Sequence, residues 1–286
     1  MSGNLSRLGL SIPSIGLGTW RLRGKECKRV VRKSLELGYR HIDAASMYEN
    51  EAEVGAGIVD SGIDRSEVFL STKINTIGWT QSQDRISVIK NENIVDVFHK
   101  SLSNLKTEYV DLLLIHWPAF STNLGDMLEI MFHIKDSQKA KAIGVANFNS
   151  NLLNECARLG FEDIYCNQVE YHPFLCQDIL LKTMKKMNII PVAYCPLCRG
   201  DVAKENVILK LSEKYNKTPS QISLRWIIQQ QAAAIPKTTS TERLKENINV
   251  YDFEIDEKDM VHISNLARNQ RLVPNIELNT FLHPWD

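Results

Sequence analysis

The sequence lacks the features that mark nucleic-acid-binding, membrane or secreted proteins. Its 34 Lys and Arg residues balance its 34 Asp and Glu residues, and no basic run is present, so charge does not favour a nucleic-acid partner. No apolar stretch approaches the ~18 residues of a membrane span. The N-terminal MSGNLSRLGLSIPS has no apolar region of the signal-peptide kind. We therefore expect a cytoplasmic protein with neither nucleic-acid nor membrane partners.

Cysteine is too sparse for a disulfide framework. The chain has six cysteines in 286 residues, whereas disulfide frameworks belong mainly to small secreted domains, so free thiols are expected. The sequence also shows no linker, low-complexity tract or internal repeat. With 43% hydrophobic residues, residues 1–286 can form a single domain with a large core.

Eight short apolar runs recur along the chain, with stretches of helical character between them. Apolar strands that alternate with amphipathic helices are typical of βα units and of a parallel sheet buried on both faces. Eight strands favour a closed (βα)8 TIM barrel of the α/β class, and an open doubly wound sheet is the alternative. The expected strands are Ile12–Leu17, Tyr39–Ile42, Val68–Ser71, Val110–Ile115, Lys141–Val145, Ile164–Asn167, Ile189–Ala193 and Ala232–Ile235.

The expected helices each have one apolar face. In Lys25–Leu37, for example, Val30, Val31 and Leu35 share a face, and Gly38 provides a helix stop. Further helices are expected at Asn91–Leu105, Leu124–Ile134, Asn151–Leu159, Leu175–Met187, Asn206–Tyr215, Pro219–Gln230 and Thr241–Val250, and one is expected to begin near Tyr48. The additions to the barrel are an N-terminal hairpin within Leu5–Ile12 across its floor, an extra helix at Asp256–Leu266 and an irregular C-terminal tail at Val273–Asp286.

Polar, titratable and aromatic residues gather where the expected strands end. The active site of a (βα)8 barrel lies at the carboxyl ends of its strands, and packing alone would not concentrate such residues there. In chain order, the strand tips are Gly18-Thr19-Trp20, Asp43 with Tyr48 after it, Lys73, His116-Trp117, Ala146-Asn147, Gln168 to Tyr171, Tyr194-Cys195-Pro196 and Pro236-Lys237-Thr238.

Four of these residues, Asp43, Tyr48, Lys73 and His116, are interpreted as a proton-donor set. A free tyrosine, with a pKa of ~10, is a poor acid at neutral pH. We expect the Lys73 ammonium to lower the pKa of Tyr48, and Asp43 to hold Lys73 charged and in place. His116 would orient a carbonyl oxygen or assist the proton transfer. The simpler alternative is an ordinary Asp–Lys ion pair beside a capping histidine, since an aspartate that ends a strand is often a cap or turn residue.

The sequence resembles the aldo-keto reductase family from Ile15 to about Tyr251, and within it the compact prokaryote-type 2,5-diketogluconate reductase branch. The order and spacing of several motifs carry the resemblance. They are GLGTW (Gly16–Trp20), GYRHIDAASMYENE (Gly38–Glu51), DLLLIHWP (Asp111–Pro118), GVANF (Gly144–Phe148), NQVEYHP (Asn167–Pro173) and IPKTTSTERLKEN (Ile235–Asn247).

The resemblance implies a monomeric, NADP(H)-dependent reductase of small aldehydes or ketones. Tyr48 would be the general acid, supported by Asp43, Lys73 and His116, and Trp20 and Trp117 would line the substrate mouth with Tyr48 and His116. Trp79 is a further candidate for that mouth. For the nicotinamide, the resemblance implies that Tyr194 stacks on the ring and that Asn147 and Gln168 bind its carboxamide. For the other end of the cofactor, it implies that Lys237, Thr238 and Arg243 bind the 2′-phosphate and that Glu246 and Asn247 contact the adenine. Further cofactor contacts are implied for Thr19, Trp20, Asp43, Cys195 and Leu197.

Three positions depart from the family pattern. Ala146 stands where serine normally precedes the asparagine, which removes one hydroxyl from the carboxamide site, and a neutral hydrogen bond contributes only ~0.5–1.5 kcal/mol net. Ala44 stands where threonine or serine is common. Cys195 replaces a frequent serine and creates a CxxC motif with Cys198.

The CxxC motif also raises redox and zinc interpretations. A thioredoxin-type motif needs a helix N-terminus directly after a strand, and one CxxC supplies two of the four ligands of a structural zinc site. His172 and Cys176 could complete such a set, although their spacing does not require it, and we expect no metal. A separate hypothesis is that oxidation of Cys195 beside the cofactor slows turnover.

Two other classes of function fit parts of the sequence. His41 and Asp43 could begin the metal site of a barrel hydrolase, although two histidines are the usual opening pair and no other strand tip adds a carboxylate and a histidine. A cofactor-binding regulatory subunit that senses nicotinamide redox state with little turnover is the second. Oxidation of NADPH by a panel of aldehydes separates the reductase from both alternatives.

Overall fold

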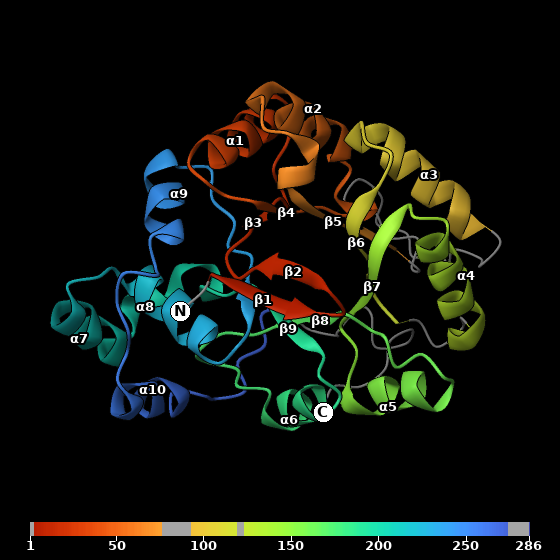
Figure 1. Cartoon of the computed structure of the whole chain (residues 1–286). Coiled ribbons are helices and arrows are strands. Elements are labelled where there is room, and N and C mark those ends of the chain that lie inside the picture. Colours follow the sequence, from red (N-terminus) through yellow and green to blue (C-terminus); the bar gives the residue numbers. More distant parts are fainter. Residues whose placement is uncertain (1–2, 76–92, 119–122, 274–285) are drawn as a thin grey trace.

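The computed structural model describes residues 3–75, 93–118, 123–273 and 286. Its main sheet has eight strands, and every neighbouring pair is parallel. Figure 1 looks along the axis around which the sheet curls. In chain order the strands are β3 (Leu17–Gly18), β4 (His41–Asp43), β5 (Phe69–Ile74), β6 (Val110–Ile115), β7 (Ala140–Ala146), β8 (Cys166–Glu170), β9 (Ile190–Tyr194) and β10 (Ala233–Ala234).

The first and last strands meet, so the sheet closes into a barrel. The N–H of Gly16 donates to the carbonyl of Ala234 at 2.9 Å, and the N–H of Gly18 donates to that of Pro236 at 3.1 Å. A Cβ on Gly18 would lie 2.7 Å from the carbonyl oxygen of Ile235, so only glycine permits this approach. The predicted (βα)8 barrel is confirmed, and the open sheet is excluded.

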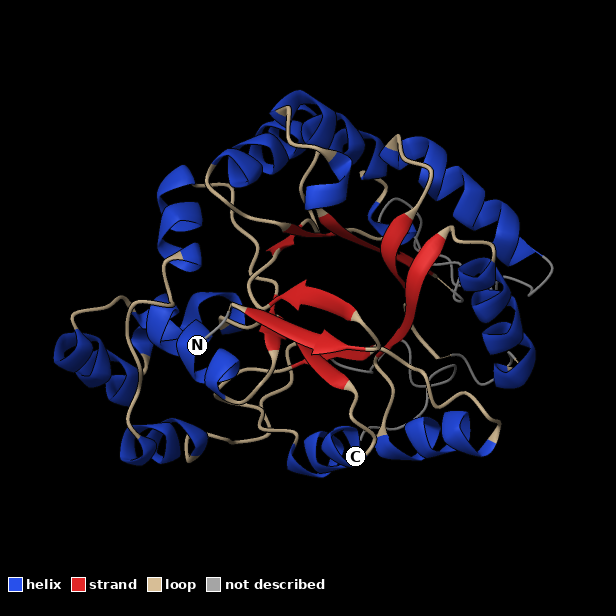
Figure 2. Cartoon of the chain, viewed as in Figure 1, coloured by secondary structure: helices blue, strands red, loops and turns tan. Residues whose placement is uncertain are grey.

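Helices form a ring outside the strands (Figure 2). The predicted alternation of strands and helices is confirmed, and Pro219 begins its helix behind a capping box formed by Thr218 and Gln221. The helices are α1 (Gly24–Glu36), α2 (Glu51–Ser61), α3 (Ile94–Leu105), α4 (Leu124–Asp136), α5 (Ser150–Arg158), α6 (Asp178–Lys186), α7 (Asn206–Tyr215), α8 (Pro219–Gln229), α9 (Thr241–Ile248) and α10 (Glu257–Ser264), with short 3-10 helices η1 (Ser46–Tyr48), η2 (Arg65–Glu67) and η4 (Cys198–Lys204).

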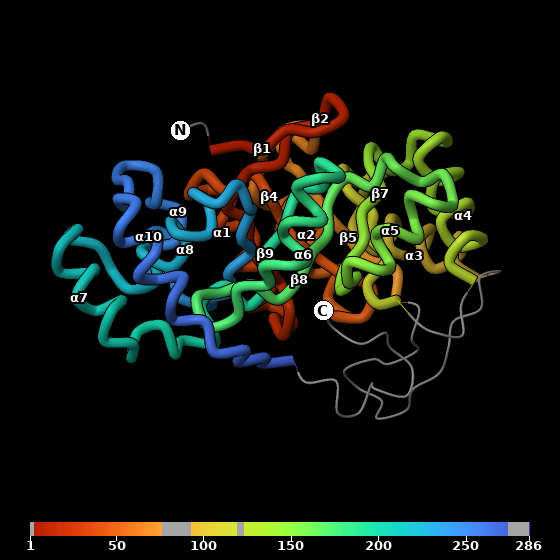
Figure 3. Tube along the Cα trace, turned by 90° about the horizontal axis from the view of Figure 1, so that it is seen from below, coloured from red at the N-terminus to blue at the C-terminus, as the bar shows by residue number. Residues whose placement is uncertain are grey.

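An N-terminal hairpin of β1 (Asn4–Arg7) and β2 (Leu10–Pro13) covers one end of the barrel (Figures 1 and 3). The guanidinium of Arg7 donates to the carbonyls of Ile164 at 3.0 Å and Asn188 at 2.5 Å. Both carbonyls precede a barrel strand, so the hairpin lies at the amino ends of the strands. The carboxyl ends therefore open at the opposite end.

The boundary between the hairpin and the first barrel strand was predicted wrongly. The apolar run Ile12–Leu17 belongs to two elements, because Ile12 lies in β2 and the barrel strand β3 begins only at Leu17. Ile12 packs into the interior of the barrel, whereas Leu17 packs in the outer layer. Both environments are apolar, and the sequence therefore reads as one run.

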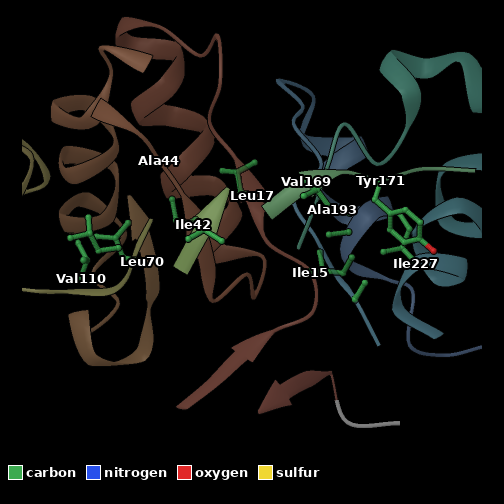
Figure 4. Packing of buried hydrophobic residues seen from close by; sticks show 14 of the residues in the cluster. Ile15, Leu17, Ile42, Ala44, Leu70, Val110, Val169, Tyr171, Ala193 and Ile227 are labelled. Carbon is green, nitrogen blue, oxygen red and sulfur yellow. The ribbon is translucent and has the colours of Figure 1, made fainter. Parts of the chain in front are cut away.

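The side chains of each strand alternate between two cores. On β6, Leu112 and Leu114 point into the barrel, whereas Leu113 and Ile115 pack against the helices. Figure 4 shows part of the outer core, with residues from several strands and from α8. Because both faces of β6 are apolar, its sequence reads as a continuous hydrophobic run.

Other boundaries also moved. The predicted strand Ile164–Asn167 lies later in the chain, at Cys166–Glu170, and the helix predicted from Leu175 begins at Asp178 because a turn closed by the Leu175 N–H and the His172 carbonyl comes first. The 3-10 helix η4 was not predicted. Trp79 and most of the tail lie outside the described residues. Within those residues, no helix is long and apolar enough to cross a membrane.

Candidate active site

Asp43 is the side chain around which the candidate site is built. It is the last residue of β4, is 1% exposed, and its Oδ2 accepts a hydrogen bond from the Lys73 ammonium at 2.6 Å. Its Oδ1 accepts from the Ser71 hydroxyl at 2.8 Å and from the Gln168 amide at 2.9 Å. Both oxygens of the carboxylate are therefore occupied, which fixes the side chain.

Lys73, on β5, is fully buried and uses all three of its N–H donors. They reach Asp43 Oδ2, the carbonyl of Ala44 at 2.8 Å and the hydroxyl of Tyr48 at 3.3 Å. Burial lowers the pKa of Lys73, while the charge and hydrogen bond of Asp43 oppose that change. The lysine is thus a fixed cation that joins the carboxylate to the phenol.

Tyr48, at the end of η1, does not have the lowered pKa that the sequence predicted. Burial raises its pKa well above the ordinary value, and the charges of Asp43, Tyr194 and Cys195 add to the rise. The expectation that Lys73 makes this phenol acidic is therefore wrong for the site as the structure describes it, because removing water from the phenolate has the larger effect. The phenol stays protonated at neutral pH.

His116, which follows β6, faces the phenol. The two rings lie edge to face with their centroids 5.6 Å apart, and His116 is 6% exposed. Burial and the charge of Lys73 lower the pKa of His116 well below its ordinary value, so the imidazole is neutral. Its Nδ1 is buried and has no hydrogen-bond partner among the residues described. A neutral imidazole can donate a hydrogen bond to an oxygen placed between it and Tyr48.

Several residues that sequence reasoning missed hold this arrangement. The Ser46 hydroxyl donates to the carbonyl of Lys73 at 2.9 Å, and the guanidinium of Arg23 donates to the carbonyl of Tyr48. The amide of Asn50 donates to the carbonyl of Thr19 at 2.8 Å. The remaining missed residue, Ser71, carried a usable signal: it lies two residues before Lys73, and side chains two apart on a strand share a face.

The residues predicted for the nicotinamide lie beside the four site residues. Asn147 donates from its amide to the carbonyl of His116 at 2.9 Å and accepts from the Tyr194 hydroxyl at 2.8 Å. Gln168 contacts Asp43 directly, and the Thr19 hydroxyl donates to the Asp43 carbonyl at 2.8 Å. These side chains are thus brought together at one rim, as the strand-tip argument requires.

The two tryptophans predicted for the substrate mouth also lie at this rim. Trp20 is half-buried and packs against the cluster of Ala45, Met47 and Tyr48. Trp117 is 8% exposed, and its ring stacks on His116 at 6.2 Å between centroids. Aromatic side chains therefore lie on both sides of the Tyr48–His116 pair.

The residues predicted for the 2′-phosphate surround the N-terminus of α9. The hydroxyl of Ser240 caps the helix by accepting from the Arg243 N–H at 3.2 Å, and the Thr238 hydroxyl accepts from the Ser240 N–H at 3.1 Å. Lys237 and Arg243 are exposed, and no carboxylate among the described residues lies within ion-pair distance of either. Two uncompensated cations at a helix N-terminus fit a phosphate group.

The two residues predicted for the adenine, Glu246 and Asn247, lie on α9. One carboxylate oxygen of Glu246 already accepts a hydrogen bond from the Thr218 hydroxyl at 2.6 Å, and Asn247 is 3% exposed. Cys195 and Leu197, predicted to contact the cofactor, lie between Tyr194 and η4 and are both half-buried. No group of three or more His, Cys, Asp or Glu side chains in the described parts of the chain is arranged to hold a metal ion.

A closed (βα)8 barrel with a buried Asp–Lys–Tyr–His group at the carboxyl ends of its strands has the architecture of a TIM-barrel enzyme. Residues 14–268 match the aldo/keto reductase family, and the chain belongs to that family of oxidoreductases. Carbonyl reduction with a nicotinamide cofactor is the family's chemistry.

The comparisons with individual proteins agree with this membership. The chain is 38% identical to the 9,11-endoperoxide prostaglandin H2 reductase of Trypanosoma cruzi, over 91% of this chain and 90% of that one. It is 35% identical to the glyoxal reductase of Bacillus subtilis, over 93% of each chain. A crystal structure described as that of a 2,5-diketo-D-gluconic acid reductase B matches with a TM-score of 0.91 and 34% identity, covering 100% of this chain and 98% of that one.

Proposed function

We propose that the protein reduces small aldehydes and ketones to alcohols with NADPH, and that Tyr48 donates the proton. The observation that carries the proposal is the 3.3 Å distance between the Tyr48 hydroxyl and the Lys73 ammonium. This contact lies in a buried site whose lysine is paired with Asp43 and whose histidine is neutral. A protonated donor, a fixed cation and a hydrogen-bond donor for the carbonyl oxygen are thus next to one another.

The geometry supports the following division of roles. The reduced nicotinamide, when bound, supplies the hydride for the carbonyl carbon. His116 orients the carbonyl oxygen, and Tyr48 gives its proton to that oxygen as negative charge develops there. The raised pKa of Tyr48 does not prevent this transfer, because an alkoxide is a stronger base than a phenolate.

Lys73 stabilises the anion that the transfer leaves behind. A phenolate at Tyr48 would lie 3.3 Å from the ammonium nitrogen, and at an effective dielectric constant of about 20 two unit charges at that distance attract each other by about 5 kcal/mol. Asp43 keeps the ammonium in position through the 2.6 Å ion pair. The Lys73 ammonium therefore attracts the phenolate more strongly than the neutral phenol. This difference stabilises the transition state relative to the ground state and so increases the rate.

For the cofactor, we assign the 2′-phosphate to Lys237, Thr238 and Arg243, because these residues present uncompensated positive charge and a hydroxyl at the start of α9. Asn147 and Gln168 would receive the carboxamide. Tyr194 would stack on the nicotinamide ring after releasing Asn147. These assignments make NADP(H) the preferred cofactor over NAD(H).

The chain by itself supplies every member of the four-residue site, which supports a monomer as the working unit. All six cysteines are free, which is consistent with a reducing compartment such as the cytoplasm.

The direct test is an assay of NADPH absorbance with small carbonyl compounds, beginning with glyoxal because one relative is named a glyoxal reductase. Oxidation of NADPH that depends on both the enzyme and the carbonyl, with the alcohol recovered as product, supports the proposal. If the protein binds NADPH but leaves it unchanged across aldehydes, ketones and dicarbonyls, the regulatory-subunit alternative replaces it.

A further inference from the structure

The turn that follows β9 carries two cysteines at its first and fourth positions. Cys195 comes directly after Tyr194, and Cys198 begins η4. The N–H of Cys198 donates to the carbonyl of Cys195 at 2.9 Å, which closes the turn. The first and fourth Cα atoms of such a turn lie within ~7 Å of each other, and disulfides join residues whose Cα atoms are ~4.4–6.8 Å apart.

We propose that Cys195 and Cys198 form a reversible dithiol–disulfide pair that hydrogen peroxide oxidises. The other four cysteines, at positions 27, 156, 166 and 176, are each at least ten residues from any other cysteine in the sequence. The pair is therefore the only one in the sequence with the CxxC spacing, at which a disulfide closes a single turn.

The two thiols differ in exposure, and this difference assigns their roles. Cys195 is half-buried and interacts with the side chain of Arg199. Cys198 is fully buried, and its sulfur accepts from the Gln270 amide at 3.7 Å. Cys195 is thus the thiol that meets the oxidant, and Cys198 is the thiol that resolves the product.

The chemistry balances in two steps. The Cys195 thiolate attacks one oxygen of hydrogen peroxide, the O–O bond breaks, and a sulfenic acid and hydroxide form. The Cys198 sulfur then displaces the sulfenic hydroxyl, which leaves as water when it takes up a proton. Overall, two thiols lose two electrons and two protons, and one peroxide becomes two waters.

The surroundings make this reaction slow at neutral pH. Burial raises the pKa of Cys195 to about 11, with Glu170 acting in the same direction and Arg199 opposing it. Burial also raises the pKa of Cys198 to about 12; Asp201, Glu170 and the Cys195 thiolate add to the rise, while Arg268 opposes it. The thiolate is the nucleophile, and its fraction grows with pH. As long as the pH is below the pKa of Cys195, the rate of oxidation should therefore increase about tenfold for each unit of increase in pH.

The disulfide would change the part of the chain proposed to bind the cofactor. Formation of the disulfide removes the Cys195 sulfur from its interaction with Arg199 and the Cys198 sulfur from its hydrogen bond with Gln270. Gln270 comes shortly before Leu272 and Val273, whose N–H groups donate to the Glu170 carboxylate at 2.6 and 3.0 Å. Glu170 in turn lies opposite Tyr194 in the register of β8 and β9. We therefore expect the oxidised chain to bind NADPH about tenfold more weakly, a loss equivalent to one or two hydrogen bonds; this consequence rests on the proposed function.

The test uses the full chain and one tryptic peptide. Trypsin cleavage after Lys186 and Arg199 releases Met187–Arg199, whose two cysteines are Cys195 and Cys198. After treatment with hydrogen peroxide and alkylation, mass spectrometry should find this peptide unalkylated and lighter by two hydrogen atoms, and dithiothreitol should restore two alkylation sites. The conversion should be faster at pH 9 than at pH 7.

Variants separate the roles of the thiols. After peroxide treatment, Cys198→Ser should carry Cys195 as a sulfenic or sulfinic acid, and Cys195→Ser should keep Cys198 alkylatable. Cys176→Ser is the control: it removes the other half-buried thiol and should form the disulfide normally. The proposal is overturned if the wild-type peptide keeps two alkylatable thiols or gains only oxygen atoms.

A second measurement compares NADPH binding by reduced and oxidised chains through protein fluorescence. Because the peptide reports the disulfide without NADPH, failure of the proposed function and failure of this pair are distinguishable.

Discussion

The hydroxyl oxygen of Tyr48 lies 3.3 Å from the ammonium nitrogen of Lys73, and that ammonium lies 2.6 Å from a carboxylate oxygen of Asp43. The contact places a protonated phenol next to a cation that cannot turn away, because all three of its donors are used. Catalysis through this contact requires the ammonium to be present and held in place. The first two predictions remove those conditions one at a time.

Replacing Lys73 with methionine should lower kcat for carbonyl reduction by about 10²- to 10⁴-fold, the usual contribution of a tuned proton donor. The variant also leaves Asp43 buried without its counter-ion, which costs about 3–5 kcal/mol of stability. Circular dichroism and a urea titration must therefore show that the variant is folded at the assay temperature. The double variant Lys73→Met with Asp43→Asn should regain stability but not activity, and recovery of activity in it would contradict the role assigned to Lys73.

Replacing Ser71 with alanine should loosen Asp43, because its Oδ1 keeps only the Gln168 donor. We expect kcat/KM to fall by about tenfold and the free energy of unfolding by about 1–2 kcal/mol. Ser223→Ala is the matched control: Ser223 is also fully buried and donates to a backbone carbonyl, that of Pro219 at 2.9 Å, on α8. Equal losses of kcat/KM in the two variants would mean that Ser71 acts only on stability.

Replacing Lys237 or Arg243 with methionine should weaken NADPH binding by about 10- to 100-fold, because a hydrogen bond to a charged group contributes about 1.5–3 kcal/mol. Affinity for NADH should hardly change, since NADH lacks the 2′-phosphate. Lys245→Met removes an exposed cation from the same helix, in its last turn, and should leave both affinities unchanged. Fluorescence titration gives all of these dissociation constants. If NADH binding weakens as much as NADPH binding, Lys237 and Arg243 do not bind the 2′-phosphate.

The stability of the fold should fall with acidification through His41. Burial lowers the pKa of His41 to about 4, whereas an unfolded chain takes up this proton near pH ~6.5. Between these two values only the unfolded state is protonated, so the free energy of unfolding decreases as pH falls, by roughly 3 kcal/mol over the window. His116, whose pKa is also lowered, acts in the same direction.

Urea unfolding of the wild type and of His41→Gln at pH 7.5, 5.5 and 4.5 measures the contribution of His41. The variant should lose less stability than the wild type between pH 7.5 and 4.5. Parallel pH profiles would show that His41 is not held neutral in the folded state.

Local sequence patterns predict most of this fold and the four central side chains. Strands such as Val110–Ile115 read as apolar runs because both faces are buried, and glycine and polar residues mark their ends. Once the barrel is recognised, the strand tips give Asp43, Lys73 and His116 directly, since each stands within one residue of the end of a strand.

Other features depend on contacts that a sequence does not contain. Ser71 reaches Asp43 because β4 and β5 pair with these two residues opposite each other, and strand register is a property of the assembled sheet. The pKa of Tyr48 is set by how completely the folded chain excludes water from it, and a nearby lysine in the sequence says nothing about that. The run Ile12–Leu17 hid a boundary because the barrel interior and the outer core are equally apolar.

The measurement that tests the account most directly is the single-turnover rate of hydride transfer in Tyr48→Phe with NADPH bound. Phenylalanine keeps the ring against His116 and removes only the hydroxyl. The rate should fall by at least about 10²-fold, while the dissociation constant for NADPH stays within a few-fold of the wild-type value. A near-normal rate in the folded, NADPH-bound variant would contradict the assignment of Tyr48 as the proton donor.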